Sequence, residues 1–465
     1  MTDGDEQAAK LNAWAKEQGV IESNGNGNGS RPLIKVPSDQ RELIEFCREC
    51  ADVLSKEDRL FRRDRTPVVI NREKGRLDAI TARTLCSFAQ QYIRFYKFKT
   101  VEKESGEKET VTVLKNIATQ TAGVLLESLQ LVNSLPEIRR VNPTRLPVVR
   151  ADGRIDLLKP GYFAEQGIYT IDDGIVYDER MTSNRGQEIL DDLLKDFPFL
   201  NARSRAVAIA AMFTMFCATM LPRHALRPGF ISTANGTGAG KTLIFKIPIY
   251  AVTGSCSLRT LPRREEARKV LDSLAISARS YILFDNVRGR IASEDVEAFI
   301  TSAEIYGRLL GETSDFRVDN VATIFLTGNQ ASTSPDMAER CLFVELFIEE
   351  VDNRARHISR IIDDDFLAEP ARRAEMLSAM WALVRAWEAD GKPRAPSPFM
   401  PRFEQWSRLV GGIVYNSGFG DPLEEPAISR DAELRDMHEL MKVLAPEKGD
   451  KQASIEKLYA GHGGL

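Results

Sequence analysis

Cysteine and histidine are scarce in this sequence: six cysteines and four histidines occur among 465 residues. Cys47 and Cys50 form the single Cys-x-x-Cys pair, and without a second pair a tetrahedral zinc site lacks its remaining ligands. We therefore expect these two thiols to lie in a core or on a surface. Few cysteines and no signal-peptide pattern at the N-terminus indicate a reducing, cytoplasmic environment.

Long apolar runs and an excess of positive charge are also missing. The longest uncharged run, residues 206–221, is shorter than the ~18–20 apolar residues that cross a bilayer. It predicts a buried helix, and we expect no membrane contact. The net charge is −4 and the pI about 5.9. This balance does not indicate nucleic-acid binding, but a ring-shaped motor needs only a few Lys and Arg on its pore loops.

The length and the 43% hydrophobic content predict two or three folded domains. A run of Asn and Gly at residues 24–30 is too polar to fold alone. From about residue 201, strand and helix patterns alternate, which is typical of a parallel sheet covered by helices. The expected parts are a disordered tail (1–33), a mixed α+β domain (34–200), a strand–helix core (201–350), a helical lid (351–425) and a helical tail that is a candidate partial winged helix (426–465).

The first folded region has mixed signals. Its patterns predict helices at 42–54, 80–96 and 114–134, a strand at 67–70, and short strands with Gly-containing turns across 145–177. The strand at 67–70 lies in a basic neighbourhood that either contacts nucleic acid or forms a solvated, partly charge-paired surface. Its members are Arg59, Arg62, Arg63, Arg65, Arg72, Lys74 and Arg76.

The sharpest motif is a Gly-rich turn between a short apolar strand and a helix, in residues 229–245. Glycines let consecutive backbone N–H groups turn onto an anion, and a helix N-terminus adds favourable partial charge. Lys241 is expected to reach the β- and γ-phosphates of ATP, and Thr242 to place its hydroxyl on Mg²⁺. The predicted nucleotide-binding residues are Asn235, Gly236, Thr237, Gly238, Ala239, Gly240, Lys241, Thr242 and Leu243.

This phosphate-binding loop, or P-loop, departs from the usual G-x-x-x-x-G-K-[ST] at its first position, where Asn235 replaces Gly. Asn tolerates positive φ better than most residues, so we expect the turn to survive the replacement.

A second part of the site follows on a strand. Residues 281–284 are apolar and lead to Asp285, which is expected to hold Mg²⁺ through water. Many such ATPases carry Glu at the next position as the base that polarises water, but this chain has Asn286, which cannot accept a proton. Another carboxylate must then act, or hydrolysis proceeds by positioning alone. The candidate carboxylates are Glu266, Glu294 and Glu304.

Two further elements complete the pattern. A third strand ends at Asn329, and because ligands bind at the carboxyl ends of parallel strands, Asn329 is a candidate for orienting the attacking water. Arg340 precedes a fourth strand and is a candidate for stabilising transition-state charge at a neighbouring subunit's nucleotide. The alternative for Arg340 is a salt bridge with Asp336 or Glu339.

In this order and spacing the four elements resemble the AAA+ ATPases, specifically the helicase-type ATPases of phages and mobile elements near the superfamily-three and minichromosome-maintenance-like helicases. The resemblance covers about residues 145–420. The stretches that carry it are LPVVRADGR (146–154), PGY (160–162), ILFDNV (282–287), GRLLG (307–311), FLTGN (325–329), DMAER (336–340) and WSRLVGG (406–412).

The resemblance implies an α/β P-loop core of the AAA+ kind, with helices on both faces of a parallel sheet and a helical lid. It also implies a homo-oligomeric ring, a hexamer, that translocates on single-stranded or forked DNA. Relatives often have two adjacent arginines where this chain has Glu339 and Arg340, so only Arg340 inherits the finger role. Arg308 is a candidate second trans-acting residue, and Arg408 a candidate nucleotide contact from the lid. Candidate pore-loop residues are Arg288, Arg290 and Arg317, for which a solvated charged loop is the alternative.

The leading functional hypothesis is an ATP-driven DNA helicase or translocase that serves replication of a phage or mobile element. An initiator or loader, in which ATP acts as a switch and DNA is bound without unwinding, is the first alternative. Directional strand separation distinguishes the two. A small-molecule P-loop kinase and an ATPase in phage defence are further alternatives.

Overall fold

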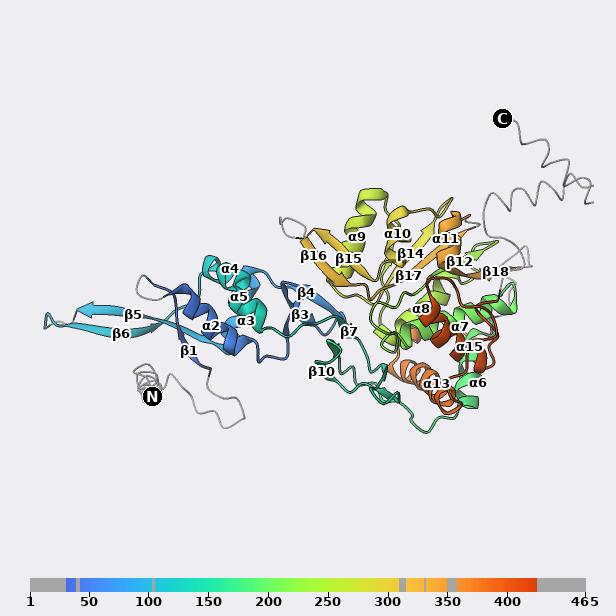
Figure 1. Ribbon diagram of the computed structural model, residues 1–465, viewed down its shortest axis with the longest axis horizontal. Helices are drawn as coiled ribbons and strands as arrows, with labels where there is room; N and C mark the ends of the chain where they lie inside the picture. The colour runs from blue at the N-terminus through green and yellow to red at the C-terminus, as the bar shows by residue number, and fades with distance from the viewer. Residues whose placement is uncertain are drawn as a thin grey trace, which may run out of the picture. The chain divides into compact units, whose positions relative to one another are not determined.

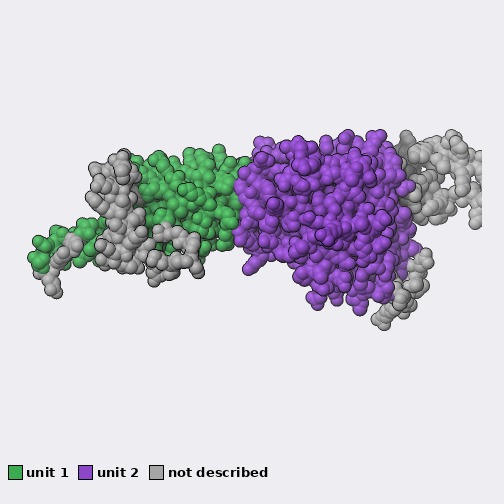
Figure 2. All heavy atoms as spheres, turned by 90° about the horizontal axis from the view of Figure 1, so that it is seen from below, with its two compact units in different colours: residues 1–69, 78–137 green, residues 70–77, 138–465 purple. Residues whose placement is uncertain are grey.

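The computed structural model describes residues 31–38, 42–102, 105–308, 315–329, 332–348 and 358–424. These residues form two compact units (Figure 2). Unit 1 consists of residues 1–69 and 78–137, and unit 2 of residues 70–77 and 138–465. Residues 1–30 of the expected disordered tail (1–33) and the expected helical tail from residue 426 lie outside the described residues. The end of the first tail is wrong, because Leu33 already opens a strand.

Unit 1 packs helices and short sheets around its own core. Its elements are β1 (Leu33–Lys35), α2 (Leu43–Leu54), β2 (Leu60–Arg63), α3 (Ala82–Tyr92), β5 (Arg94–Glu102), β6 (Lys108–Leu114), α4 (Thr119–Glu127) and α5 (Leu129–Ser134). Strands β3 (Thr66–Asn71) and β4 (Arg76–Ala79) also start or end in it, with residues 70–71 and 76–77 assigned to unit 2. Helix α2 buries Phe46, Cys47, Cys50 and Leu54 along one face, which confirms a core role for the two thiols. Burial also raises the pKa of the Cys47 thiol.

The predicted helix at 80–96 is wrong in its last part. Helix α3 starts with a capping box between Thr81 and Thr84 and ends at Tyr92. Residue 94 then opens β5, which pairs antiparallel with β6. Alternation of aromatic and β-branched residues with lysines favours a strand here. The predicted strand at 67–70 matches β3, and the predicted helix at 114–134 is split into α4 and α5 at Ser128, which caps α5.

Unit 2 contains the predicted parallel sheet. The elements before it are β7 (Arg140–Asn142), β8 (Pro147–Val149), β9 (Ile155–Leu157), β10 (Gly161–Phe163), β11 (Ile168–Thr170), α6 (Ser183–Leu194) and α7 (Ala202–Phe216). The core elements are β12 (Gly229–Ala234), α8 (Lys241–Thr253), β13 (Leu258–Arg259), α9 (Arg264–Ile276), β14 (Tyr281–Val287), α10 (Glu294–Ile300), β15 (Glu304–Arg308), β16 (Asp315–Asp319), β17 (Thr323–Asn329), α11 (Pro335–Arg340) and β18 (Cys341–Leu346). The last elements are α12 (Asp364–Ala368), α13 (Pro370–Ala389), α14 (Glu404–Trp406), the π-helical turn η2 (Ser407–Gly411) and α15 (Gly412–Asn416).

Five strands of unit 2 form one sheet in the order β13-β14-β17-β12-β18, with every neighbouring pair parallel (Figure 1). This confirms the predicted α/β core. Strand β12, which leads into the P-loop, lies between β17 and β18, and β17 separates it from β14. The carboxyl ends of β12, β14 and β17 therefore meet at one edge of the sheet.

Aromatic rings join the sheet to the C-terminal helices. The Phe230 ring lies 5.6 Å from Phe325 and 6.3 Å from Trp406 between centroids. The Trp406 indole N–H donates to Thr214 on α7 at 2.8 Å. Helix α7 is buried along almost its whole length, as the uncharged run predicted. Within the described residues, no helix is long and apolar enough to cross a membrane.

The division into units differs from the expected boundary at residue 200. Residues 138–200 group with the sheet of unit 2. Helix α6 packs so closely against α13 that a Cβ at Gly186 would lie 2.8 Å from the Ala379 carbonyl oxygen. The helical lid expected over 351–425 therefore packs on a helix that was expected in the N-terminal domain.

Candidate nucleotide site

The P-loop lies between β12 and α8, and its glycines have specific conformations. Gly238 and Gly240 have φ values of 76° and 94°, which side chains other than Gly rarely adopt. A Cβ at Gly240 would also lie 2.8 Å from the Phe197 ring. Gly240 is the N-cap of α8, and no side chain caps this helix. The amides of its first turn are therefore available to an anion.

Asn235 is tolerated for a different reason from the expected one. It is not among the residues with positive φ, so the expectation based on positive φ is wrong. Its side-chain amide donates to the Ile348 carbonyl at 2.8 Å, and its side-chain oxygen accepts from the Ile348 N–H at 2.9 Å. These two hydrogen bonds tie the start of the P-loop to the chain that follows β18.

Asp285 connects three elements of the site. Its Oδ1 accepts hydrogen bonds from the hydroxyls of Thr242 on α8 and Thr327 on β17, each at 2.6 Å. The structure thus brings together the two residues that the sequence assigned to Mg²⁺. Carboxylate and hydroxyl oxygens are the ligands that Mg²⁺ accepts at phosphate sites. Thr327 was not singled out from the sequence, although it lies two residues before Asn329 on the expected strand.

Asn286 has a role that the sequence did not suggest. Its φ is 55°, and the pairing of β14 with β17 shifts register between Phe284 and Val287. The Asn286 N–H donates to the Thr327 hydroxyl at 2.9 Å. Asn is among the few non-Gly residues that adopt this left-handed conformation readily. The backbone bulge thus favours Asn at this position, where the sequence pattern led us to look for a Glu.

Lys241 and the residues around it line a pocket of about 630 Å³. The Lys241 ammonium donates to the Gly236 carbonyl at 3.2 Å. Burial lowers its pKa, and the nearby charge of Asp285 opposes that change. The pocket is also lined by Asp363, Asp364 and Asp365. Sequence reasoning missed this acidic run, whose signal is three consecutive aspartates at the start of a helix.

Lys246 and Asp364 both line this pocket. Their side chains form an ion pair at 2.8 Å between α8 and α12. Helix α12, at the start of the expected lid, therefore closes one side of the space in front of the P-loop.

Asn329 lies at the end of β17, paired in register with Ala234 at the end of β12. Ala234 directly precedes the P-loop, so the backbone of Asn329 is at the sheet edge where the sequence predicted it.

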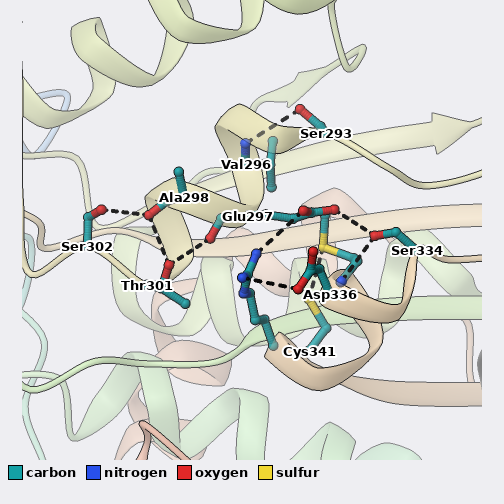
Figure 3. Close-up of polar contacts among 11 residues, drawn as sticks. Ser293, Val296, Glu297, Ala298, Thr301, Ser302, Ser334, Asp336 and Cys341 are labelled. Carbon is teal, nitrogen blue, oxygen red and sulfur yellow. Dashed lines mark hydrogen bonds and ion pairs between the residues drawn. The ribbon is translucent and has the colours of Figure 1, made fainter.

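Arg340 is held by two carboxylates of its own chain, those of Glu297 and Asp336, both of which are labelled in Figure 3. Its guanidinium lies 3.4 Å from Glu297 on α10 and 3.3 Å from Asp336. Glu297 is only 7% exposed and also accepts a hydrogen bond from the Ser334 hydroxyl at 2.6 Å. The salt bridge with Asp336, which was the alternative to a trans-acting role for Arg340, is thus present in the structure. Glu297 was missed, because nothing in the sequence links a residue of α10 to the end of α11.

The three carboxylates proposed as catalytic bases take no part in the hydrogen bond between Thr242 and Asp285. Glu266 pairs with Lys269 at 2.6 Å, and Glu294 starts α10. Glu304 on β15 binds Arg317, which lowers the pKa of this carboxyl. The structure therefore selects none of them as the base.

The other arginines that the sequence proposed as trans-acting, lid or pore-loop residues lie as follows. Arg317 is the partner of Glu304, and Arg408 lies 5.7 Å from the centroid of the Phe399 ring. Arg288 and Arg290 are exposed in the segment after β14, and Arg308 ends β15.

His224, Glu304 and Asp319 gather within reach of one cation. Arg317 binds Glu304, however, and Arg223 lies 3.2 Å from Asp319. Because guanidiniums already compensate both carboxylates, we interpret this cluster as an ion-pair network.

No protein-family model matches the sequence, and no curated protein matches it. Three solved structures are similar to it at low identity. The apo C-terminal region of NrS-1 has 12% identity over 77% of this chain and 72% of its own, with a TM-score of 0.34. The SCCmec type IV Cch active helicase has 14% identity over 80% and 70%, with a TM-score of 0.31. The JCV helicase has 12% identity over 53% and 76%, with a TM-score of 0.23. Two of the three are helicases, but because these TM-scores are low, the likeness assigns no activity to this chain.

Proposed function

We propose that this chain is a Mg²⁺-dependent ATPase that uses ATP hydrolysis to move along DNA, as a helicase or translocase. The observation that carries the proposal is the contact of Asp285 with both Thr242 and Thr327. This contact links the hydroxyl that follows the Gly-rich turn, the carboxylate of β14 and the strand that ends at Asn329. All three lie at the edge of the sheet that faces the N-terminus of α8, which no side chain caps.

Each residue of this edge has a separate task in the proposal. The amides of the P-loop and of the first turn of α8 bind the phosphates, and Lys241 contacts the β- and γ-phosphates. Thr242 and Asp285 hold Mg²⁺, which when bound neutralises charge on the phosphate oxygens. Asn329 orients the attacking water. Catalysis then depends on positioning and electrostatics, which matches the absence of Glu at position 286.

Arg340 is proposed to act at the nucleotide of a neighbouring subunit in a homo-oligomeric ring of six chains, as the AAA+ resemblance implies. In the single chain its guanidinium is engaged by Glu297 and Asp336. A role in trans therefore requires that the guanidinium exchange at least one carboxylate for a phosphate oxygen.

The proposal is tested by ATP turnover with and without single-stranded DNA, and by separation of a forked duplex. We expect DNA to stimulate turnover in the wild type, strand separation to require ATP, and Lys241→Ala to abolish both. Lys246→Ala is the matched control, because Lys246 lines the same pocket but pairs with Asp364.

The switch alternative is favoured by Asn286, which supplies no proton acceptor where a base is expected. Tight ATP binding without turnover, in the presence or absence of DNA, would replace the motor by an initiator or loader that is switched by nucleotide.

A further inference from the structure

The sheet formed by β1, β5 and β6 in unit 1 has one covered face. Strand β1 pairs parallel with β5, so that Ile34 lies beside Phe95 and Lys35 beside Tyr96. Ile34 and Phe95 are each 3% exposed and belong to the core of unit 1. Because side chains alternate between the faces of a strand, Lys35, Tyr96 and Phe98 share the opposite face.

That opposite face is open and carries aromatic rings. The rings of Tyr96 and Phe98 meet edge to face at 5.5 Å between centroids. Phe98 is 44% exposed, and Leu114, which pairs with Tyr96 across the strands, is 52% exposed. The Lys35 ammonium lies 4.9 Å from the centroid of the Phe98 ring. A positive charge thus lies beside a ring with free surface.

Beyond this point the two strands continue as a ribbon. From Phe98 to Glu102 every residue of β5 is exposed, and Figure 1 shows β5 and β6 extending away from the helices of unit 1. A two-stranded hairpin is marginally stable in water by itself. Exposed rings and aliphatic side chains on such a ribbon indicate that it functions with a bound partner.

The charges of the sheet identify the chemistry of that partner. Alternation of side chains along β1, β5 and β6 gives the open face three basic side chains and one acidic one, in a chain whose net charge is −4. The three bases are Lys35, Arg94 and Lys108, and the acid is Glu102, which pairs across the strands with Lys108 at the far end of the ribbon. A second copy of the same face would bring the same positive charges, whereas a phosphate backbone is complementary to them.

We propose that the open face of the β1–β5–β6 sheet binds single-stranded nucleic acid, with Phe98 and Tyr96 as stacking surfaces for bases and with Lys35 and Arg94 as phosphate contacts. Aromatic rings stack on unpaired bases regardless of sequence, and basic side chains beside them follow the backbone. The assignment deepens the proposed function, on which it rests for its ligand class, and it places a nucleic-acid site in unit 1, outside the ATPase sheet.

The first experiment measures binding by the full chain without nucleotide. The probe is fluorescein-labelled oligothymidine of about 20 nucleotides, longer than the ~4–16 nucleotides that one OB-fold platform covers. We expect Phe98→Ala to weaken binding about 5- to 100-fold, the range for loss of one stacked base. Phe98→Trp keeps a ring and should bind like the wild type. Leu114→Ala removes an exposed apolar side chain from the same face and should have little effect.

A salt titration tests the phosphate contacts. Lys35→Ala should reduce the slope of log affinity against log salt by about 0.7, the value for one phosphate contact on a single strand. Oligouridine and a duplex of equal length distinguish RNA, DNA and double-stranded ligands. We expect the duplex to bind more weakly than either single strand, because its bases are already stacked.

Two results would overturn the assignment: equal affinity of Phe98→Ala and wild type, or photocrosslinks from bromodeoxyuridine DNA that fall only in unit 2. A change of oligomeric state in Phe98→Ala, measured by light scattering with unchanged affinity per subunit, would show instead that the ribbon contacts another copy of the chain.

Failure of the proposed function gives a different pattern. If the chain binds single strands through Phe98 but DNA does not stimulate ATP turnover, the binding site stands and the proposed motor function is wrong.

Discussion

Two polar clusters of unit 2 are built from similar groups but differ in charge balance. At the P-loop, Asp285 accepts hydrogen bonds from two neutral hydroxyls, those of Thr242 and Thr327. In the other cluster, Glu297 accepts from the Ser334 hydroxyl and lies against the Arg340 guanidinium. A carboxylate held by hydroxyls keeps its charge for an incoming cation, whereas one beside a guanidinium is already neutralised. The comparison therefore supports the proposal that the first cluster binds a cation, whereas the Arg340 guanidinium of the second is already engaged within its own chain.

The largest expected effect concerns Asp285. Asp285→Asn removes the charge but keeps an oxygen that can accept from Thr242 or Thr327. We expect ATP turnover to fall by about 100-fold or more, because a metal-held phosphate loses several kcal/mol of charge stabilisation. Turnover measured across a Mg²⁺ titration checks this.

The matched control is Asp364→Asn, which alters an acid that lines the same pocket. An equal loss in both variants would remove the distinction between Asp285 and the other acids of the pocket.

The second cluster predicts a loss of stability. Arg340→Ala leaves Glu297 nearly buried without its cation, which should lower the free energy of unfolding by roughly 2 kcal/mol. Adding Glu297→Gln removes the unpaired charge and should restore part of that loss. Urea unfolding of the two single variants and the double variant gives the coupling energy.

If the double variant is no more stable than Arg340→Ala, the two side chains are not coupled. A turnover defect in Arg340→Ala that Glu297→Gln does not relieve would add a role for Arg340 in trans, and the contrast between the two clusters would then be incomplete.

A smaller effect is expected at Asn286, whose backbone is left-handed. Asn286→Ala should cost about 1 kcal/mol of unfolding free energy, while Asn286→Gly should cost little, because Gly adopts this conformation without strain. Thermal unfolding distinguishes the two variants. Reduced turnover in the stable Asn286→Gly variant would assign the side-chain amide to the reaction, in addition to its role in the bulge.

The smallest effect concerns Lys241 without nucleotide. Burial lowers the pKa of its ammonium, so between the folded and unfolded pKa values the folded chain binds fewer protons than the unfolded chain. The free energy of unfolding should therefore rise as pH increases through the lowered pKa. Lys241→Met should remove this rise and stabilise the nucleotide-free chain slightly at neutral pH. A steeper pH dependence in Lys241→Met would contradict the assignment.

Expectations from the sequence succeeded where they depended on local order. The strand before the P-loop, the glycines and the strand with Asp285 are contiguous patterns, and the structure has them in place. Residues 138–200 were expected in the N-terminal domain but group with unit 2. The sequence could not show this, because the packing of α6 on α13 joins segments almost 200 positions apart. The ribbon of β5 and β6 was missed because its first residues continued a helical pattern.

The sequence by itself predicted the Gly-rich turn before α8, the parallel sheet and the acid near the end of β14, because glycine conformation and apolar periodicity act over a few neighbouring residues. The tertiary structure decided which side chains meet. It brought Thr327 to Asp285, paired Arg340 with Glu297, and tied Asn235 to Ile348 instead of giving it positive φ. Each of these contacts joins residues more than 40 positions apart, and their distances depend on how the strands are ordered in the sheet and how the helices pack on it.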